Sequence, residues 1–224
     1  MPEVASEKLA SILSELASIL PSQYDLDRDK LEITLVDSEP ATIENFKELA
    51  TILPSQYKLD LADGKITIMP VHIQTSQKEA RLISRVTIWC DNNPRLVGIF
   101  GSSQACFTLP LPTETVRGPG AFVILANSWN ALSPNDQNEA FPPIVPDFVA
   151  EIRSNSNTVD FCHQKMLMYM DAGAQEGFLI DPINQTVTIY RINGNNIVWN
   201  ERRNPRTVTS QILNGFVLNM QGII

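Results

Sequence analysis

The stretch "IVPDFVAEIRSNS", Ile144–Ser156, carries the strongest fold signal in this chain. Its apolar run predicts a β-strand, in which alternate side chains face the same side of a sheet. One face is then wholly apolar, formed by Phe148, Ala150 and Ile152. The opposite face carries Glu151 and Arg153, and an unpaired buried carboxylate is costly. This charged face must therefore meet water, a partner or an ion.

Two interpretations of the charged face follow from the strand alone. In the first, Glu151 and Arg153 form an ion pair on an exposed surface. In the second, they belong to an active site carried by the strand. A carboxylate there binds Mg²⁺, and a cation two residues further on stabilises the attacked phosphate or its nucleophile. The strand pattern is compatible with both.

The residues that follow predict a helix and a hairpin. "SNSNTVD" supplies N-cap side chains for a helix of about Val159–Asp171, with Gly173 as its C-cap. "EGFLID" is typical of a strand that turns at "DPINQ" into a second strand, "TVTIYRI". We expect the strand Phe148–Arg153 to be central in a mixed sheet. It should neighbour the short buried strand that begins near Ala121, with the helix covering one face.

The preceding segment predicts one long helix and two further strands. Apolar residues at helical spacing favour a helix of roughly Gln77–Asp91, which Pro94 ends; they are Leu82, Ile83, Val86 and Trp89. "LVGIFG" from Leu96 and "ACFTLP" from Ala105 are predicted to form a hairpin joined at "GSSQ". Helices, then strands, one helix and a hairpin indicate an α+β or mixed α/β layer protein.

The N-terminal part contains a repeat. "LASILPSQYDLD" begins at Leu16 and "LATILPSQYKLD" begins 33 residues later, at Leu49. Each copy predicts the end of a helix, a turn at proline and an alternating strand, "KLEITLV" or "GKITIMPV". Two copies are fewer than the roughly three that a solenoid needs, so one local unit is duplicated. The unit serves packing or dimer contact, or alternatively acts as a recognition arm.

We expect the two copies to share one helix–turn–strand conformation, because the same residues set the same turn. Residues 1–37 are then an N-terminal helix–strand extension that duplicates this unit. Residues 38–224 form the main domain.

Composition limits the class of protein. The chain has 224 residues, 43% of them apolar, which suits one ordinary domain plus an extension. Its net charge of −8 argues against coating nucleic acid through bulk electrostatics, although a local basic cleft stays open. The three cysteines have no CxxC spacing, which favours a reduced protein. The sequence has no apolar run of membrane-spanning length and no signal-peptide pattern. Together these features predict a cytoplasmic protein.

From about Leu49 to Arg191 the chain resembles a bacterial family called putative restriction endonucleases, a branch of the PD-(D/E)XK nuclease superfamily. The matching pattern is Pro-Asp, an apolar run, Glu, a serine turn, a helix with Lys and Tyr, Gly, and "DP" before a hairpin. These positions are Pro146, Asp147, Glu151, Ser154, Ser156, Lys165, Tyr169, Gly173, Asp181 and Pro182. "WNAL" at Trp129 and "FPP" at Phe141 also resemble the family.

The resemblance implies a restriction-endonuclease-like fold, with a mixed central sheet flanked by helices, and Mg²⁺-dependent hydrolysis of DNA phosphodiesters. Glu151 is then the metal ligand, and Arg153 and Lys165 stabilise charge. Arg153 occupies the position of an expected lysine and stays protonated, but it can clamp a phosphate bidentately. Lys165 is either exposed or points toward Glu151. Homodimers are common in this superfamily.

One expected metal ligand is missing. The family has an Asp after a Pro at the start of a strand, whereas "VRGPGAFVI" has Gly120 there. A single carboxylate holds Mg²⁺ weakly. Asp147 is a poor substitute, because four residues of strand place it roughly 13 Å from Glu151; Glu114 and Glu79 are the other candidates. The resemblance thus implies an impaired endonuclease, or alternatively a silent nucleic-acid-binding or protein-interaction module.

Overall fold

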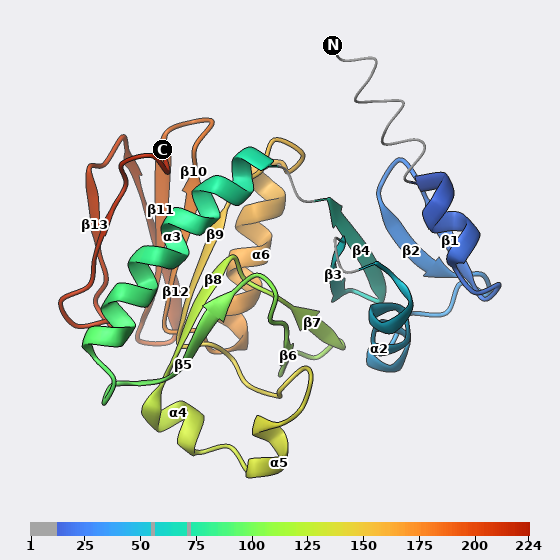
Figure 1. Cartoon of the computed structure of the whole chain (residues 1–224), viewed down its shortest axis with the longest axis horizontal. Helices are drawn as coiled ribbons and strands as arrows, with labels where there is room; N and C mark the ends of the chain where they lie inside the picture. The colour runs from blue at the N-terminus through green and yellow to red at the C-terminus, as the bar shows by residue number, and fades with distance from the viewer. Residues whose placement is uncertain (1–12, 55–56, 71–72) are drawn as a thin grey trace. The chain divides into compact units, whose positions relative to one another are not determined.

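A computed structural model describes residues 13–54, 57–70 and 73–224 (Figure 1). The chain divides into two compact units. The first holds the described residues up to 70 together with Pro112–Arg117, and the second holds the described residues from 73 to Leu111 together with Gly118–Ile224. The boundary expected between residues 37 and 38 falls inside the first unit. That 38–224 folds without the first copy therefore stays a prediction.

The first unit is built on an antiparallel sheet. Helical residues 13–19 precede β1 (Tyr24–Asp27) and β2 (Glu32–Leu35), and α2 (Ile43–Ile52) precedes β3 (Tyr57–Ala62) and β4 (Lys65–Pro70). The strands run in the order β1-β2-β4-β3, and β7 (Thr115–Arg117) pairs with β3. A buried ion pair joins this last pair of strands, with Arg117 Nη1 3.1 Å from Asp60 Oδ2.

The two copies of the repeat turn in the same way. The N–H of Tyr24 donates to the Pro21 carbonyl at 3.0 Å, and the N–H of Tyr57 donates to the Pro54 carbonyl at 3.0 Å. Residues 55–56 of the second turn lie outside the described part of the chain. Where both copies are described, the prediction of a shared conformation is confirmed. Each turn leads into a hairpin, and the strand expected from the alternating pattern is its second strand.

The copies face each other across a local two-fold axis. β2 pairs antiparallel with β4, and Ile33 lies opposite Ile66. These isoleucines occupy the same position in the repeat, 33 residues apart, and both are fully buried. The symmetry is approximate because the hairpin loops differ. The second uses the two residues Asp63 and Gly64, both at positive φ, as a tight hairpin turn requires.

The second unit contains a mixed sheet with strand order β12-β11-β10-β9-β8-β5. Its strands are β5 (Val97–Ser102), β8 (Ala121–Leu125), β9 (Phe148–Ile152), β10 (Glu176–Asp181), β11 (Thr186–Asn193) and β12 (Asn196–Arg203). β9 runs parallel to β10 and antiparallel to β8. The expectation that the opening stretch forms a central strand beside the one near Ala121 is confirmed.

Helices cover both faces of this sheet (Figure 1). α3 (Ile73–Asn92) packs Leu82 and Val86 on the face that carries Ala150 of β9. α6 (Val159–Ala172) packs on the opposite face, where Met166 shares a core with Val149. The C-terminal strands β13 (Thr207–Thr209) and β14 (Val217–Asn219) belong to the α3 side. The α/β fold class predicted from the order of elements is therefore confirmed.

A buried carboxylate fixes the C-terminal segment to the sheet. Glu176, at the start of β10, is fully buried. Arg191 Nε lies 2.7 Å from one of its oxygens, and the backbone N–H of Gln211 and the hydroxyl of Ser210 also donate to it. Buried charges are tolerated when they are paired and hydrogen-bonded in this way. Glu176 therefore links the segment that contains β13 and β14 to the central strands.

One expectation about the middle segment changes. β5 pairs with β8 rather than with β6 (Phe107–Leu109), so the predicted hairpin is wrong. The physical reason is that β8 offers a ladder of five residue pairs, which three-residue β6 cannot match. The segment between β8 and β9 forms the short helices α4 (Ala126–Asn130) and α5 (Pro134–Gln137).

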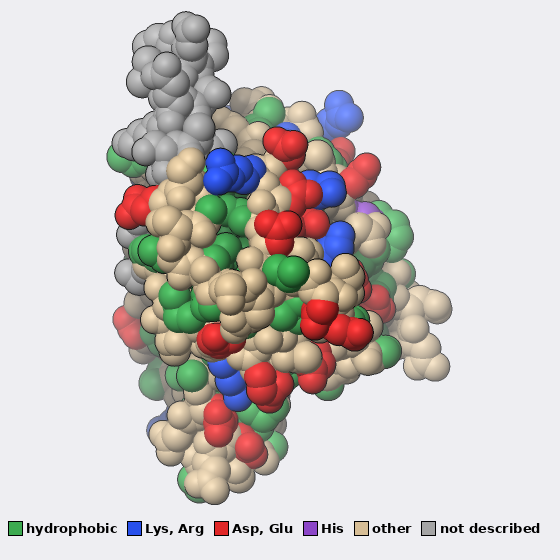
Figure 2. Space-filling model, turned by 90° about the vertical axis from the view of Figure 1, so that its right-hand side faces the viewer, with side chains coloured by type: hydrophobic (Ala, Val, Ile, Leu, Met, Phe, Trp, Pro, Cys, Tyr) green, Lys and Arg blue, Asp and Glu red, His purple; other side chains and the backbone are tan. Residues whose placement is uncertain are grey.

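The described surface reflects the acidic composition. The chain has 25 Asp and Glu against 17 Lys and Arg, and Figure 2 shows acidic side chains spread over the visible face with fewer basic ones between them. Among the described helices, none is long and apolar enough to cross a membrane.

Candidate active site

The central strand and α6 bring a carboxylate and an ammonium together. Lys165 Nζ lies 2.9 Å from Glu151 Oε1, and the two side chains are 4% and 13% exposed. The same ammonium donates to the Gly118 carbonyl at 3.3 Å and lies 6.0 Å from the centre of the Tyr169 ring. Of the two interpretations of Lys165, the one in which it points toward Glu151 is correct.

Local sequence explains why Lys165 reaches the strand. Thr158 caps α6, with its hydroxyl accepting from the Phe161 N–H at 3.1 Å, and Gly173 ends the helix at φ 122°. These caps fix the helix ends. Met166 anchors the apolar side of α6 in the core, so the preceding lysine lies at the margin of that core. A long side chain there can place its charge on the sheet surface.

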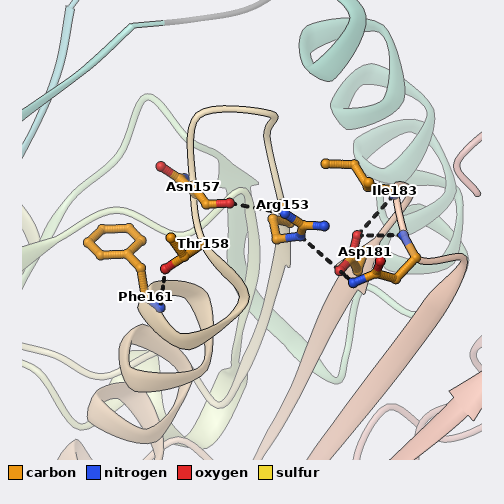
Figure 3. A network of polar contacts seen from close by, with 7 residues as sticks. Arg153, Asn157, Thr158, Phe161, Asp181 and Ile183 are labelled. Carbon is orange, nitrogen blue, oxygen red and sulfur yellow. Dashed lines mark hydrogen bonds and ion pairs between the residues drawn. The ribbon is translucent and has the colours of Figure 1, made fainter.

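Arg153 takes a different partner from the one that strand alternation suggested (Figure 3). β9 ends at Ile152, and the N–H of Arg153 donates to the Ile180 carbonyl at 2.8 Å. Its Nε lies 2.8 Å from Asp181 Oδ2, and Nη1 donates to the Asn157 carbonyl at 3.1 Å. The charge of Arg153 is therefore balanced by Asp181 at the end of the neighbouring parallel strand.

The Asp181 carboxylate is held in its charged form. Burial by itself raises its pKa, but the hydrogen bond from Arg153 and the backbone N–H groups of Asn184 and Ile183 outweigh burial and lower the pKa below its ordinary value. Figure 3 shows the Arg153 side chain and the Ile183 backbone directed toward Asp181. Arg153 is consequently fixed in place by a carboxylate that stays ionised.

A second carboxylate approaches the gap at Gly120. A Cβ built on Gly120 would lie 3.4 Å from Glu79 Oε1, 3.0 Å from the Ala150 carbonyl oxygen and 3.7 Å from the Glu151 Cα. Glu79 on α3 thus brings an oxygen to the place where an aspartate side chain would begin. Of the three substitutes considered from the sequence, Glu79 is the one that the structure brings next to Glu151.

The other two carboxylates are engaged elsewhere. Asp147 accepts from the Leu125 N–H at 2.7 Å, the Ser128 hydroxyl at 2.9 Å and Gln175 Nε2 at 2.5 Å. Asp147 therefore fixes the start of β9. This agrees with the sequence-based expectation that it lies too far from Glu151 to share a metal ion. Glu114 accepts from the Ile43 N–H at 2.7 Å and so caps α2 in the first unit.

These residues fit a metal ion only as an open, weak site. Within the described residues, no group of three or more His, Cys, Asp or Glu side chains gathers as a cage. Mg²⁺ is usually bound by one or two carboxylates, with water and substrate phosphates completing its shell. Glu151 and Glu79 match that minimal donor set, although one Glu151 oxygen is shared with Lys165.

The two buried cysteines do not act as nucleophiles. Burial, together with the nearby Glu151 charge, raises the pKa of Cys162 to about 12. Burial likewise raises the pKa of Cys90 to about 12. The thiolate is the reactive form of cysteine, so both residues are inert at neutral pH and act as small core side chains.

The sheet, its helices and the site residues together define a class of protein. A mixed sheet whose central strand carries a Glu, flanked by helices that add a Lys and a second Glu, is the architecture of a nuclease-like α/β protein. The chain belongs to the Uma2 family of putative restriction endonucleases, whose model matches residues 43–221. The first copy of the repeat precedes the matched residues.

A solved structure shares the fold. A putative nuclease of the DUF820 group from Anabaena variabilis aligns with a TM-score of 0.64 at 19% sequence identity, covering 82% of this chain and 97% of that chain. At this identity the likeness establishes the fold alone. No curated protein matches the sequence.

The position of Glu79 was indicated in the sequence only by a weak signal. It precedes Leu82 by three residues and Val86 by seven, so it lies on the buried stripe of α3. A carboxylate on an apolar helix stripe needs a partner or a function. The identity of the strand that it faces depends on tertiary packing.

Proposed function

We propose that this protein is a DNA endonuclease of low, Mg²⁺-dependent activity, whose site is reduced to Glu151, Glu79 and Lys165. The observation that supports the proposal is the buried Glu151–Lys165 pair on the central strand, with the Glu79 carboxylate beside Gly120. Family membership supports DNA as the substrate. The absence of a side chain at Gly120 supports the low activity.

In this proposal each side chain has one task. Glu151 and Glu79 would hold Mg²⁺, which supplies charge neutralisation and activation of water at a phosphodiester. Lys165 would place a positive charge beside the scissile phosphate, and its contact with the Gly118 carbonyl keeps the ammonium oriented. Because Lys165 is almost fully buried, its charge acts in a medium of low polarity, where electrostatic stabilisation is stronger than in water.

Nicking of a closed-circular plasmid tests the proposal. The wild type is compared with Glu151→Gln and Glu79→Gln in Mg²⁺, in Mn²⁺ and in EDTA. Exposed Glu139 gives the matched control, Glu139→Gln. We expect slow metal-dependent nicking that both site variants abolish and the control retains. Nicking that persists in Glu151→Gln would refute the proposal. Thermal unfolding of each variant separates loss of chemistry from loss of folding.

The alternative function is a silent nucleic-acid-binding or protein-interaction module, and the observation that favours it is Gly120. Under this alternative the wild type nicks no plasmid with either metal. DNA retention in a filter-binding assay would then distinguish nucleic-acid binding from a purely protein-directed role. The homodimer implied by the resemblance and the cytoplasmic location expected from the sequence are proposals as well. Light scattering of the purified chain tests the dimer first.

A further inference from the structure

A small cavity lies where the two parallel strands end. Its volume is about 220 Å³, and it is lined by Arg153 directly after β9, Ile183 shortly after β10, and Gln74, Thr75 and Lys78 from the start of α3. In α/β sheets, ligands commonly bind outside the carboxyl ends of parallel strands. The cavity therefore occupies a position that the fold favours for binding. All the lining residues belong to the second unit.

Two basic side chains line the cavity in an acidic protein. Lys78 and Arg153 line it, and no carboxylate is among its lining residues, although the chain carries a net charge of −8. Arg153 is held rigidly by Asp181 and the Asn157 carbonyl through Nε and Nη1. Its remaining nitrogen, Nη2, has no hydrogen-bond partner within the described residues. A preorganised guanidinium with a free donor suits a phosphate oxygen.

Lys78 and the first turn of α3 add further donors. Within residues 73–224, Lys78 forms no ion pair, and no acidic residue occurs in the first turn of this 20-residue helix. The first N–H groups of a helix lack intrahelical acceptors and favour a negative charge. Gln74 and Thr75 sit at this end of α3, so the helix adds to the same positive field.

The size and charge point to one ligand class. Pockets for drug-sized ligands span about 300–1,000 Å³, so about 220 Å³ suits a phosphate group with part of a sugar better than a whole nucleotide. A terminal phosphate carries more negative charge and more acceptor oxygens than an internal diester, which matches the Lys78 charge together with the remaining donor of Arg153. We propose that this cavity binds the terminal phosphate of a nucleic-acid strand. The inference rests on the proposed function, because it assumes that nucleic acid reaches this side of the sheet.

The test uses binding without metal, so that no cleavage contributes. Fluorescence anisotropy in EDTA compares a labelled single strand that ends in a 5′-phosphate, a 3′-phosphate or hydroxyls only. Two variants probe the cavity: Lys78→Gln, and Asn155→Asp, which adds a charge at an exposed lining residue. Arg95→Gln is the control, because it removes one exposed positive charge that does not line the cavity.

We expect one phosphorylated strand to bind about tenfold more tightly than the hydroxyl-ended strand, as one or two charge-assisted hydrogen bonds imply. That preference should disappear in both cavity variants and persist in Arg95→Gln. Equal affinity for all three strands would overturn the proposal, and so would equal losses in Lys78→Gln and Arg95→Gln. Competition by inorganic phosphate without any preference for strand ends would also overturn it. Closed-circular plasmid has no strand ends, so the nicking assay tests the proposed function separately.

Discussion

Lys165 Nζ lies 2.9 Å from Glu151 Oε1, although the two residues come from different elements on one face of the sheet. The family pattern places a cation two residues after the carboxylate, but Arg153 at that position is bound to Asp181. α6 thus supplies the cation beside Glu151, because Arg153 after β9 is paired with Asp181. A site of this kind depends on the docking of α6 as much as on the strand itself.

Breaking this pair should destabilise the fold. Lys165→Met leaves the Glu151 carboxylate buried without its cation, which costs about 3–5 kcal/mol in comparable buried pairs. Urea unfolding measures the loss. Arg203→Met, which removes the exposed Arg203–Glu201 contact of 3.6 Å, is the control and should cost less than about 1 kcal/mol. Comparable costs for the two variants would show that the buried pair adds little to stability.

Asp181 should make the free energy of unfolding depend on pH in the acid range. Its folded pKa lies below the ordinary value, so it binds protons more weakly in the folded state than in the unfolded state. The resulting stabilisation is present above the unfolded pKa of about 3.9 and is lost as pH falls through the lower folded pKa.

Asp181→Asn lacks that contribution at every pH. The gap in melting temperature between wild type and Asp181→Asn should therefore be largest near neutral pH and shrink below about pH 4. Exposed Asp171 provides the control, Asp171→Asn, which should follow the wild type throughout. A gap that stays constant down to acid pH would show that the carboxylate charge is not what stabilises this loop.

The buried thiols should resist modification. Because the pKa of Cys90 and Cys162 is raised to about 12, almost no thiolate forms at pH 8. Titration of the native protein with an aromatic disulfide reagent should give one fast thiol, that of half-buried Cys106. Cys106→Ser should remove this fast phase. Rapid modification of more than one thiol in the folded protein would contradict the burial of the other two.

Restoring the aspartate should make stability depend on metal. A side chain at Gly120 would meet the Ala150 carbonyl oxygen at 3.0 Å and would bring a carboxylate close to Glu79. Gly120→Asp should therefore lower the melting temperature in EDTA, and Mn²⁺ or Mg²⁺ should recover it by neutralising the crowded carboxylates. Calorimetry should show tighter metal binding than in the wild type. An identical response to metal in both proteins would exclude this position as a ligand site.

The first copy of the repeat is expected to be dispensable for folding of the rest. The family match begins at residue 43, after the first copy ends. A chain of residues 38–224 should keep a single cooperative unfolding transition, but the edge of β4 that Ile66 occupies would lose its neighbour. Exposed edges promote association, so this chain should also self-associate more strongly in sedimentation velocity. An unfolded monomer would place the first copy in the core of its unit.

Much of the second unit was predictable because its signals are local. The alternation in β9, the caps of α6 and the turn after Asp181 each lie within a few residues of the element they define. Lys165 and Tyr169 are four residues apart, so helical spacing puts them on one face of α6. The partner of Arg153 was not predictable, because the strand ends one residue before it and Asp181 comes from another strand. The position of Glu79 likewise depends on how α3 packs on the sheet.

The pairing of Ile33 with Ile66 within one chain determines how the contact between the two repeat copies depends on protein concentration. Two separate chains that joined through such strands would associate only when sufficiently concentrated. Here both strands belong to one covalent chain. Each strand therefore meets the other at an effective concentration of about the millimolar range, which is the value for two segments joined by a short linker. The contact therefore forms at any dilution, because its equilibrium is intramolecular and does not depend on protein concentration.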